Sequence, residues 1–184
     1  MKIFILVGGF GTRLNSVVSD VPKPMAPVGN KPFLDYQIFN IRKFFPFEKI
    51  YLLTFHMSEI IERHYSHDKN IEIIKEPKAL GTGGSIKNAI KQLYLNINTK
   101  LLVLNGDTYI NPNFDNFIKK QKSDILILGS FQKDCSRYGT LKIKNNKIIS
   151  FEEKNITSEN NYINVGCYLF NDLKFFNNIH LKNF

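Results

Sequence analysis

The chain has 184 residues, of which 43% are hydrophobic and 22% are charged, and its formal net charge is +9. This length suits one domain, residues 1–184, with a sizeable core, and no apolar run approaches the roughly 20 residues of a membrane helix. The lysines are scattered without a run of five or more cations, which argues against nucleic-acid binding and fits an anionic substrate.

The first predicted element is a buried parallel strand over residues 2–7, where an apolar, β-branched run leads into glycines. The glycines within residues 8–11 would expose backbone N–H groups, and two cations, Arg13 and Lys23, follow them. Exposed amides beside fixed cations hold polyphosphates, so this segment predicts a phosphate-binding loop.

Two better-known phosphate loops are excluded at this segment. The dinucleotide fingerprint requires Gly or Ala where Leu14 stands, and the Walker A pair of Lys with Ser or Thr follows neither Gly11 nor Gly84. The start of the chain also lacks the small-residue cleavage site of a signal peptide, so we expect a cytoplasmic protein with no membrane partner.

Strands and helices alternate up to residue 105, which predicts an α/β fold. One stripe, Leu34, Ile38, Ile41 and Phe45, gives the first helix an apolar face for a sheet. Right-handed crossovers then produce a mainly parallel sheet with helices on both faces and a ligand site at the carboxyl ends of the strands. The expected helices cover about 32–45, 58–65 and 84–95, and the expected strands cover 49–55, 70–76 and 100–105.

The pattern changes after Asp107, and we expect the second half of the chain to close over the site. A hairpin is expected around Asn145-Asn146. The cysteines, Cys135 and Cys167, have neither metal nor disulfide spacing and are expected to be reduced and structural. The expected elements of this half are a helix over 113–122, a strand over 125–131, hairpin strands over 138–144 and 147–152, and a strand over 162–170.

Motifs in a fixed order along nearly the whole chain resemble those of the sugar-1-phosphate nucleotidyltransferases. Within them, the run from Ser16 to Tyr36 is most similar to the D-glycero-D-manno-heptose 1-phosphate guanylyltransferases. The resemblance implies a Rossmann-like three-layer α/β/α fold with a mainly parallel mixed sheet. The motifs are Gly8-Gly9-Phe10-Gly11-Thr12-Arg13-Leu14, Pro22-Lys23-Pro24-Met25-Ala26-Pro27-Val28, Lys31-Pro32-Phe33-Leu34-Asp35-Tyr36, Glu76-Pro77, Leu80-Gly81-Thr82-Gly83-Gly84, Leu104-Asn105-Gly106-Asp107, Tyr138-Gly139-Thr140, Phe151-Glu152-Glu153-Lys154 and Asn164-Val165-Gly166.

The reaction that the resemblance implies is attack by a sugar 1-phosphate oxygen on the α-phosphorus of a nucleoside triphosphate, with release of pyrophosphate. Two anions meet, so charge neutralisation and in-line positioning matter more than a general base. Arg13 and Lys23 are expected to be the catalytic cations, and Asp107, which follows a strand, is expected to bind the cofactor Mg²⁺. The structural alternatives are a surface ion pair for Arg13, a solvated Lys23 and a turn-capping Asp107.

Glu76 ends a predicted strand, where its carboxylate can accept hydrogen bonds from N1–H and the exocyclic amine of guanine. This favours GTP over a pyrimidine nucleotide, and the alternative is an exposed carboxylate before a turn. The resemblance places further residues around the base, the ribose and the phosphates. The expected nucleotide-binding residues are Leu6, Gly8, Gly9, Gly11, Thr12, Arg13, Glu76, Gly81, Thr82 and Asn105.

The resemblance also implies a pocket for the sugar 1-phosphate in the second half of the chain. Its expected residues are Tyr138, Gly139, Glu153, Lys154 and Asn164. Glu153 is expected to accept hydrogen bonds from sugar hydroxyls, and Lys154 to pair with the sugar phosphate. A solvated strand end is the alternative for Glu153.

The chain departs from the family near its end. The second metal carboxylate of the family lies in an Asp-x-Gly-type motif, which the sequence lacks before Phe184, and Asp172 stands in another context. The C-terminal part of the family's domain is therefore expected to be missing, and the two alternatives are a fragment of a longer enzyme and a naturally shortened member with weakened metal binding. The open alternatives are a mannose 1-phosphate guanylyltransferase, another sugar-1-phosphate or phosphocholine nucleotidyltransferase, and a non-catalytic nucleotide-binding protein; a homo-oligomer is also left open.

Overall fold

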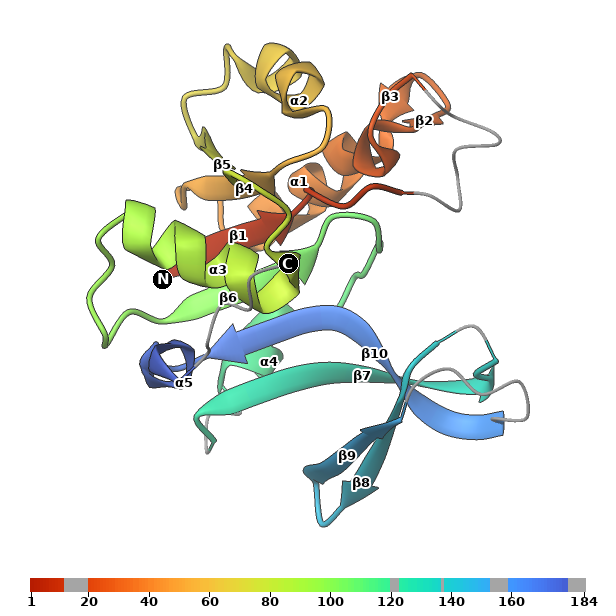
Figure 1. The fold of residues 1–184 in the computed structure, drawn as a ribbon. Coiled ribbons are helices and arrows are strands. Elements are labelled where there is room, and N and C mark those ends of the chain that lie inside the picture. The colour runs from red at the N-terminus through yellow and green to blue at the C-terminus, as the bar shows by residue number, and fades with distance from the viewer. Residues whose placement is uncertain (12–19, 120–122, 137, 153–158, 179–184) are drawn as a thin grey trace.

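The structure, a computed structural model, describes residues 1–11, 20–119, 123–136, 138–152 and 159–178. Its main sheet has eight strands, of which seven follow the order β5-β4-β1-β6-β10-β8-β9, while β7 pairs with β10 (Figure 1). These strands are β1 (Lys2–Leu6), β4 (Ile50–Thr54), β5 (Ile71–Lys75), β6 (Leu101–Asn105), β7 (Ile125–Asp134), β8 (Thr140–Lys144), β9 (Lys147–Glu152) and β10 (Glu159–Phe170).

The sheet has a parallel half and an antiparallel half. Strand β1 lies between β4 and β6 and pairs with both in parallel, and β4 pairs in parallel with β5. Strand β10 runs antiparallel to β6, β7 and β8, and β8 forms a hairpin with β9. The carboxyl ends of β1, β4, β5 and β6 therefore point the same way, which is where an α/β sheet offers a ligand site.

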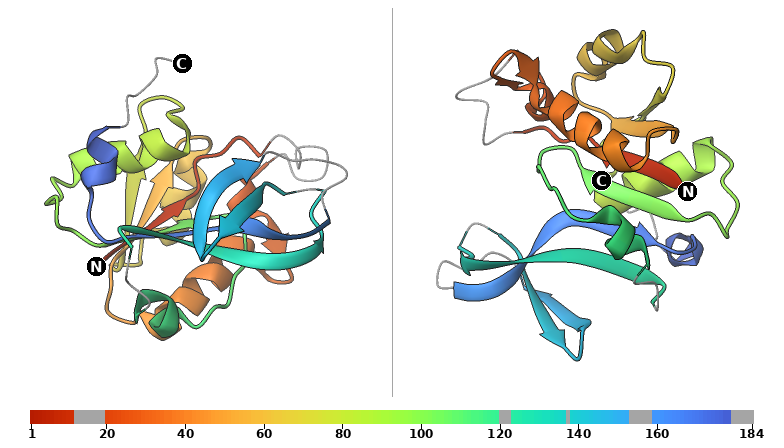
Figure 2. Two further views of the ribbon diagram at one scale, coloured as in Figure 1. Left: turned by 90° about the horizontal axis from the view of Figure 1, so that it is seen from below. Right: turned by 180° about the vertical axis from the view of Figure 1, so that it is seen from behind.

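Helices cover both faces of the sheet, as Figure 2 shows from below. The alternation of side chains along β1 explains this, because Ile3 and Ile5 pack into one core cluster while Phe4 packs into the other. One cluster contains residues of α1 (Phe33–Phe44), α2 (Ser58–Tyr65) and α4 (Phe114–Lys119). The other contains residues of α3 (Gly81–Gln92) and α5 (Lys174–Asn177). The predicted α/β fold with a mixed sheet between two helical layers is confirmed.

Several element boundaries differ from those we expected. Helix α3 begins at Gly81 instead of residue 84, because the Glu76 carboxylate accepts the Leu80 N–H at 3.2 Å and holds the turn that enters the helix. Strand β7 extends to Asp134, since its pairing with β10 continues to the pair of Glu159 and Asp134. The sequence did not predict α5, nor the short elements η1 (Lys23–Met25), β2 (Pro27–Val28) and β3 (Lys31–Pro32).

Strand β10 changes neighbours half-way along its length. Its residues from Cys167 pair with β6, whereas Tyr162 and Ile163 pair with β8. Between these stretches its register against β7 shifts, and Gly166 adopts a φ of +73°, which only glycine adopts readily. This bulge directs the long β7–β10 ribbon and the β8–β9 hairpin away from the parallel half, as Figure 1 shows.

The β8–β9 hairpin turns at Asn145 and Asn146, whose φ angles of 51° and 58° suit a two-residue hairpin turn. Both cysteines, Cys135 and Cys167, are free and buried, as expected. Of the helices that the structure describes, none is long and apolar enough to cross a membrane.

Candidate functional site

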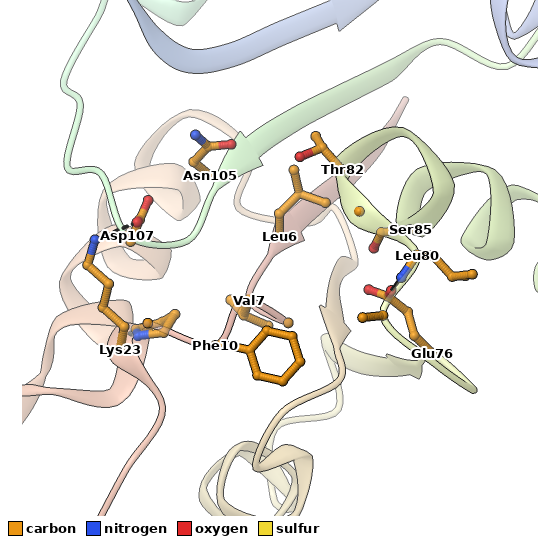
Figure 3. Close-up of a pocket in the computed structure, with 16 residues that line it drawn as sticks. Leu6, Val7, Phe10, Lys23, Glu76, Leu80, Thr82, Ser85, Asn105 and Asp107 are labelled. Carbon is orange, nitrogen blue, oxygen red and sulfur yellow. Dashed lines mark hydrogen bonds and ion pairs between the residues drawn. The ribbon is translucent and has the colours of Figure 1, made fainter. Parts of the chain in front are cut away.

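A cavity of about 390 Å³ opens at the carboxyl ends of β1, β5 and β6 (Figure 3). This volume lies within the range of small-molecule sites. The lining comes from four parts of the chain that are far apart in the sequence: residues 6–11, Lys23 with Pro24, Glu76 with residues 79–82 and Ser85, and Asn105 with Asp107. The structure thus brings together, around one cavity, all the described residues that were predicted to bind the nucleotide, the predicted catalytic cation Lys23 and the predicted metal ligand Asp107.

Lys23 is positioned by the short helix η1. Pro22 and Pro24 flank it, Pro24 and Met25 are buried, and the Met25 N–H donates to the Pro22 carbonyl at 2.7 Å. The proline rings fix φ, and the packing of Met25 into the core anchors the segment. Lys23 is thereby held at the cavity wall with its side chain 38% exposed.

The Lys23 ammonium donates to the Asp107 carboxylate at 2.6 Å. Both side chains remain more than one third exposed, so the pair has only a small effect on stability. This geometry differs from the simple turn-capping role considered for Asp107, although the Thr108 hydroxyl also donates to Asp107 at 3.3 Å. One cation and one carboxylate therefore meet at one end of the cavity.

The turn that carries Asp107 is fixed from two sides. Gln37 of α1 is 2% exposed and donates to the carbonyls of Asn105 at 2.7 Å and Thr108 at 3.2 Å. On the other side, the Gly106 N–H donates to the Leu6 carbonyl at 2.9 Å. A side chain at position 106 would collide with β1, so glycine is required for this close approach.

Asp107 suits a magnesium ligand by its chemistry. Mg²⁺ in nucleotide sites is commonly held by one or two carboxylates together with substrate phosphates and waters. Asp107 provides one such carboxylate at the cavity wall, and no group of three metal-binding side chains of His, Cys, Asp or Glu occurs among the described residues. The residues present therefore fit a metal that the substrate phosphates help to hold.

Glu76 lies at the opposite end of the cavity, at the end of β5. This residue is buried, with 7% of its surface exposed, so it is not the exposed carboxylate that was the alternative. Its backbone N–H donates to the Thr54 carbonyl at 2.9 Å, and one carboxylate oxygen accepts the Leu80 N–H. The carboxylate keeps further acceptor positions, because each oxygen can accept more than one hydrogen bond.

Several residues of the lining were not among the predicted site residues, including Phe10, Leu80 and Ser85. Phe10 is 51% exposed and lies against Phe55, with ring centroids 5.7 Å apart and ring planes at 83°. Its position inside the glycine loop was the available signal, because a large aromatic among glycines has little to bury against except a neighbouring wall or a ligand.

The predicted sugar-binding residues that the structure describes, Tyr138, Gly139 and Asn164, lie outside the lining of this cavity. The Asn164 N–H donates to the Gly139 carbonyl at 3.3 Å, and the Asn164 side chain bonds with Tyr168 and Gly166. Gly166 packs directly against the Asn105 side chain, which lines the cavity. Asn164 is therefore linked through Gly166 to Asn105 in the wall of the cavity.

The second half of the chain does not close over the site within the residues that the structure describes. The lining ends at Asp107, because the ribbon of β7 and β10 bends away from the parallel half, and Tyr138 is 46% exposed. Four predicted site residues lie outside the described residues: Thr12, Arg13, Glu153 and Lys154.

Comparisons with known proteins agree with this geometry. A family model described as nucleotidyl transferase matches residues 2–183. The chain is 37% identical over 177 residues to a D-glycero-alpha-D-manno-heptose 1-phosphate guanylyltransferase of Aneurinibacillus thermoaerophilus, with 93% of this chain and 75% of that protein covered. It is 36% identical over 173 residues to the Campylobacter jejuni protein of the same name, with 92% of this chain and 75% of that protein covered.

Solved structures show the same similarity. The crystal structure of HddC from Yersinia pseudotuberculosis complexed with GMP-PN has a TM-score of 0.83 and 34% sequence identity to this chain, covering 97% of this chain and 79% of that one. The match with the family model spans the cavity as well as the antiparallel half of the sheet.

Proposed function

Because the chain belongs to the nucleotidyl transferase family, we propose that it transfers GMP from GTP to D-glycero-D-manno-heptose 1-phosphate and releases pyrophosphate. Its relatives at 36% and 37% identity carry the name of that guanylyltransferase, so the chain is an enzyme of the sugar-1-phosphate nucleotidyltransferase class. The observation that carries the proposal is a cavity with Lys23 and Asp107 at one end and the buried Glu76 at the other.

The two ends of the cavity suit the two ends of a nucleoside triphosphate. Lys23 and Asp107 suit the phosphates, and Glu76 suits a base that presents hydrogen-bond donors. Guanine presents N1–H and its amine on the same edge, so one carboxylate can accept both hydrogen bonds. The cavity volume of about 390 Å³ fits a ligand of this size.

The reaction demands charge neutralisation because a sugar phosphate attacks another phosphate. The attacking phosphate oxygen is already ionised, so no general base is needed. We propose that Lys23 leaves Asp107 and pairs with oxygens of the α-phosphate, where charge develops in the transition state. Arg13, two residues beyond Gly11, is proposed to pair with the departing pyrophosphate.

Asp107 is proposed to hold Mg²⁺. When bound, the metal would neutralise phosphate charge as a Lewis acid. Gln37 and Gly106 keep the Asp107 turn fixed against α1 and β1, so its carboxylate is already at the cavity wall before substrates arrive. The chain thus supplies a preorganised ligand with little rearrangement of the backbone.

The sugar phosphate is proposed to bind between the phosphate end of the cavity and the segment of Asn164. The hydrogen bonds of Asn164 with Gly139 and Tyr168 hold its amide in place, and Gly166 joins this segment to Asn105. Glu153 and Lys154 are proposed to bind the sugar hydroxyls and the sugar phosphate. Heptose is proposed on the strength of the relatives' names.

The test is a matrix of four nucleoside triphosphates against heptose, mannose and glucose 1-phosphates, with pyrophosphate release and the nucleotide sugar both measured. The proposal predicts that GTP with the heptose phosphate has the highest kcat/KM. A higher kcat/KM for mannose 1-phosphate or for another nucleotide would contradict the proposed substrates. Pyrophosphate release in the absence of a sugar phosphate would contradict the proposed transfer reaction.

A further inference from the structure

The Ser85 side chain is buried at the cavity without a hydrogen-bond partner. Ser85 lies in α3, is 4% exposed and lines the cavity. Its hydroxyl oxygen makes no hydrogen bond with any residue that the structure describes. A buried hydroxyl without a partner is unusual in a folded protein, because its desolvation is not compensated.

The helix offers this hydroxyl a partner that it does not use. Serine within a helix commonly donates back to a carbonyl one turn earlier. Ser85 makes no such bond, and the first turn of α3 also has neither a side-chain cap nor an acidic residue. Both features leave donors of this turn available to a ligand in the cavity.

The position of Ser85 shows which part of a ligand it would meet. Figure 3 shows Ser85 beside Leu80 and Glu76, across the cavity from Lys23 and Asp107. The cation and the metal-binding carboxylate define the phosphate end of a bound nucleotide. Ser85 therefore belongs to the base end.

We infer that the Ser85 hydroxyl donates a hydrogen bond to O6 of a guanine base whose N1–H and amine are bound by Glu76. This inference rests on the proposed function and adds a residue that determines base specificity. An ionised carboxylate only accepts hydrogen bonds, so Glu76 cannot serve O6, which needs a donor beside it. Among the described side chains of the lining, the other donors are Lys23 at the phosphate end, the exposed Thr82, and Asn105 on β6.

The inference predicts a loss that depends on the chemical groups of the base. The dissociation constants of GTP, inosine triphosphate and 2-aminopurine riboside triphosphate are measured by calorimetry for the wild type and for Ser85→Ala, with Mg²⁺ present. Inosine keeps O6 and N1–H and lacks the amine, whereas 2-aminopurine keeps the amine and lacks both O6 and N1–H. Ser85→Ala is expected to weaken GTP and inosine triphosphate by the same factor, roughly 5- to 10-fold, and to leave 2-aminopurine binding unchanged.

Two further variants separate recognition from structure. Asn88→Ala removes another buried group without a hydrogen-bond partner from α3, outside the cavity lining, and is expected to leave all three affinities unchanged. Ser85→Cys keeps the approximate volume with a weaker donor and is expected to give an intermediate loss for GTP. An equal loss for all three nucleotides in Ser85→Ala would mean that the serine only supports the helix, and would overturn the inference.

The inference and the proposed function fail in different ways. If the wild type prefers GTP over the 2-aminopurine nucleotide and Ser85→Ala keeps that preference in full, the inference alone is overturned. If the wild type binds both nucleotides equally, the guanine assignment is overturned together with the inference. A loss shared by GTP and the 2-aminopurine nucleotide, with inosine triphosphate unaffected, would show that Ser85 contacts the amine and would also overturn the O6 assignment.

Discussion

The Lys23 ammonium lies 2.6 Å from the Asp107 carboxylate, although 84 positions separate the two residues in the sequence. The pair joins the segment after the glycine loop to the end of β6. Exposed pairs of this kind contribute at most about 1 kcal/mol, so the two side chains can separate at little cost. Under the proposed function, substrate phosphates and a metal would give each of them a stronger partner, so we expect the pair to be the resting arrangement of the site.

Lys23→Ala should lower turnover far more than nucleotide affinity. Removing a charge that acts on the transition state is expected to lower kcat by about 10²- to 10³-fold, while the dissociation constant of GTP changes within about threefold. Steady-state kinetics and calorimetry measure the two quantities. Lys49→Ala is a matched control, because Lys49 pairs with Glu72 at 3.0 Å with similar exposure. Equal losses of turnover and affinity would mean that Lys23 only binds.

Asp107→Asn should abolish activity together with the magnesium dependence of nucleotide binding. The amide keeps the shape of the side chain but loses the charge that a hard cation requires. Calorimetric titration of Mg²⁺ into the GTP complex measures this without turnover. Asp172→Asn is the control, since Asp172 pairs with Lys174 outside this cavity. Unchanged magnesium affinity in Asp107→Asn would remove this residue from the metal role.

Glu76→Gln should reduce the preference for GTP over ATP. The amide presents a donor as well as an acceptor, so it no longer matches the two donors of guanine, and the ratio of kcat/KM values is expected to fall by about 10-fold or more. Glu72→Gln, in β5 with a half-buried side chain that pairs with Lys49 away from the cavity, should keep the ratio. A preference that survives in Glu76→Gln would assign base selection to the backbone.

Gly106→Ala should destabilise the fold at the site. A methyl group there would lie 2.5 Å from Val7 Cγ1 and 2.7 Å from the Leu6 carbonyl oxygen. Such overpacking is expected to lower the free energy of unfolding by about 1–3 kcal/mol in urea titrations. At Gly9 a methyl group would meet no atom within 4 Å, so Gly9→Ala should stay within about 0.5 kcal/mol. Similar values for the two variants would contradict the close packing of β1 against the Asp107 turn.

Alkaline pH should weaken the protein through Cys167. Burial raises the pKa of its thiol to about 12, whereas an unfolded thiol ionises at about pH 8.5. Above that pH the unfolded chain loses a proton that the folded chain keeps, so the free energy of unfolding falls as pH rises toward 12. Chemical denaturation between pH 8 and 10.5 should show a shallower decline in Cys167→Ala. Parallel declines would contradict the raised pKa.

Much of the parallel half could be predicted because its signals are local. The stripe of Leu34, Ile38 and Ile41 is buried as expected, and the glycine loop follows β1 at the strand end where ligands bind. The presence of Glu76 and Asp107 at such ends could be predicted for the same reason. Helix periodicity and the ends of strands can both be predicted from neighbouring residues, without knowing which distant residues are in contact.

The rest of the site depends on contacts between distant residues. Nothing near Gln37 in the sequence indicates that it would bond with the carbonyls on either side of Asp107. The approach of Lys23 to Asp107 likewise follows from the parallel pairing of β1 with β6. The bulge at Gly166 keeps the hairpin away from the cavity. It depends on which strands pair with β10 on either side of it, and the only local sign of it in the sequence is one glycine.

Guanylyl transfer is tested most directly by following the α-phosphorus of GTP. The protein is incubated with α-labelled GTP, Mg²⁺ and D-glycero-D-manno-heptose 1-phosphate, and the label and pyrophosphate are quantified together. We expect the label to enter a GDP-sugar in one-to-one ratio with pyrophosphate, and Lys23→Ala to lose both products equally. Label that stays in GTP, or that enters GMP or GDP without a sugar, would contradict guanylyl transfer at this site.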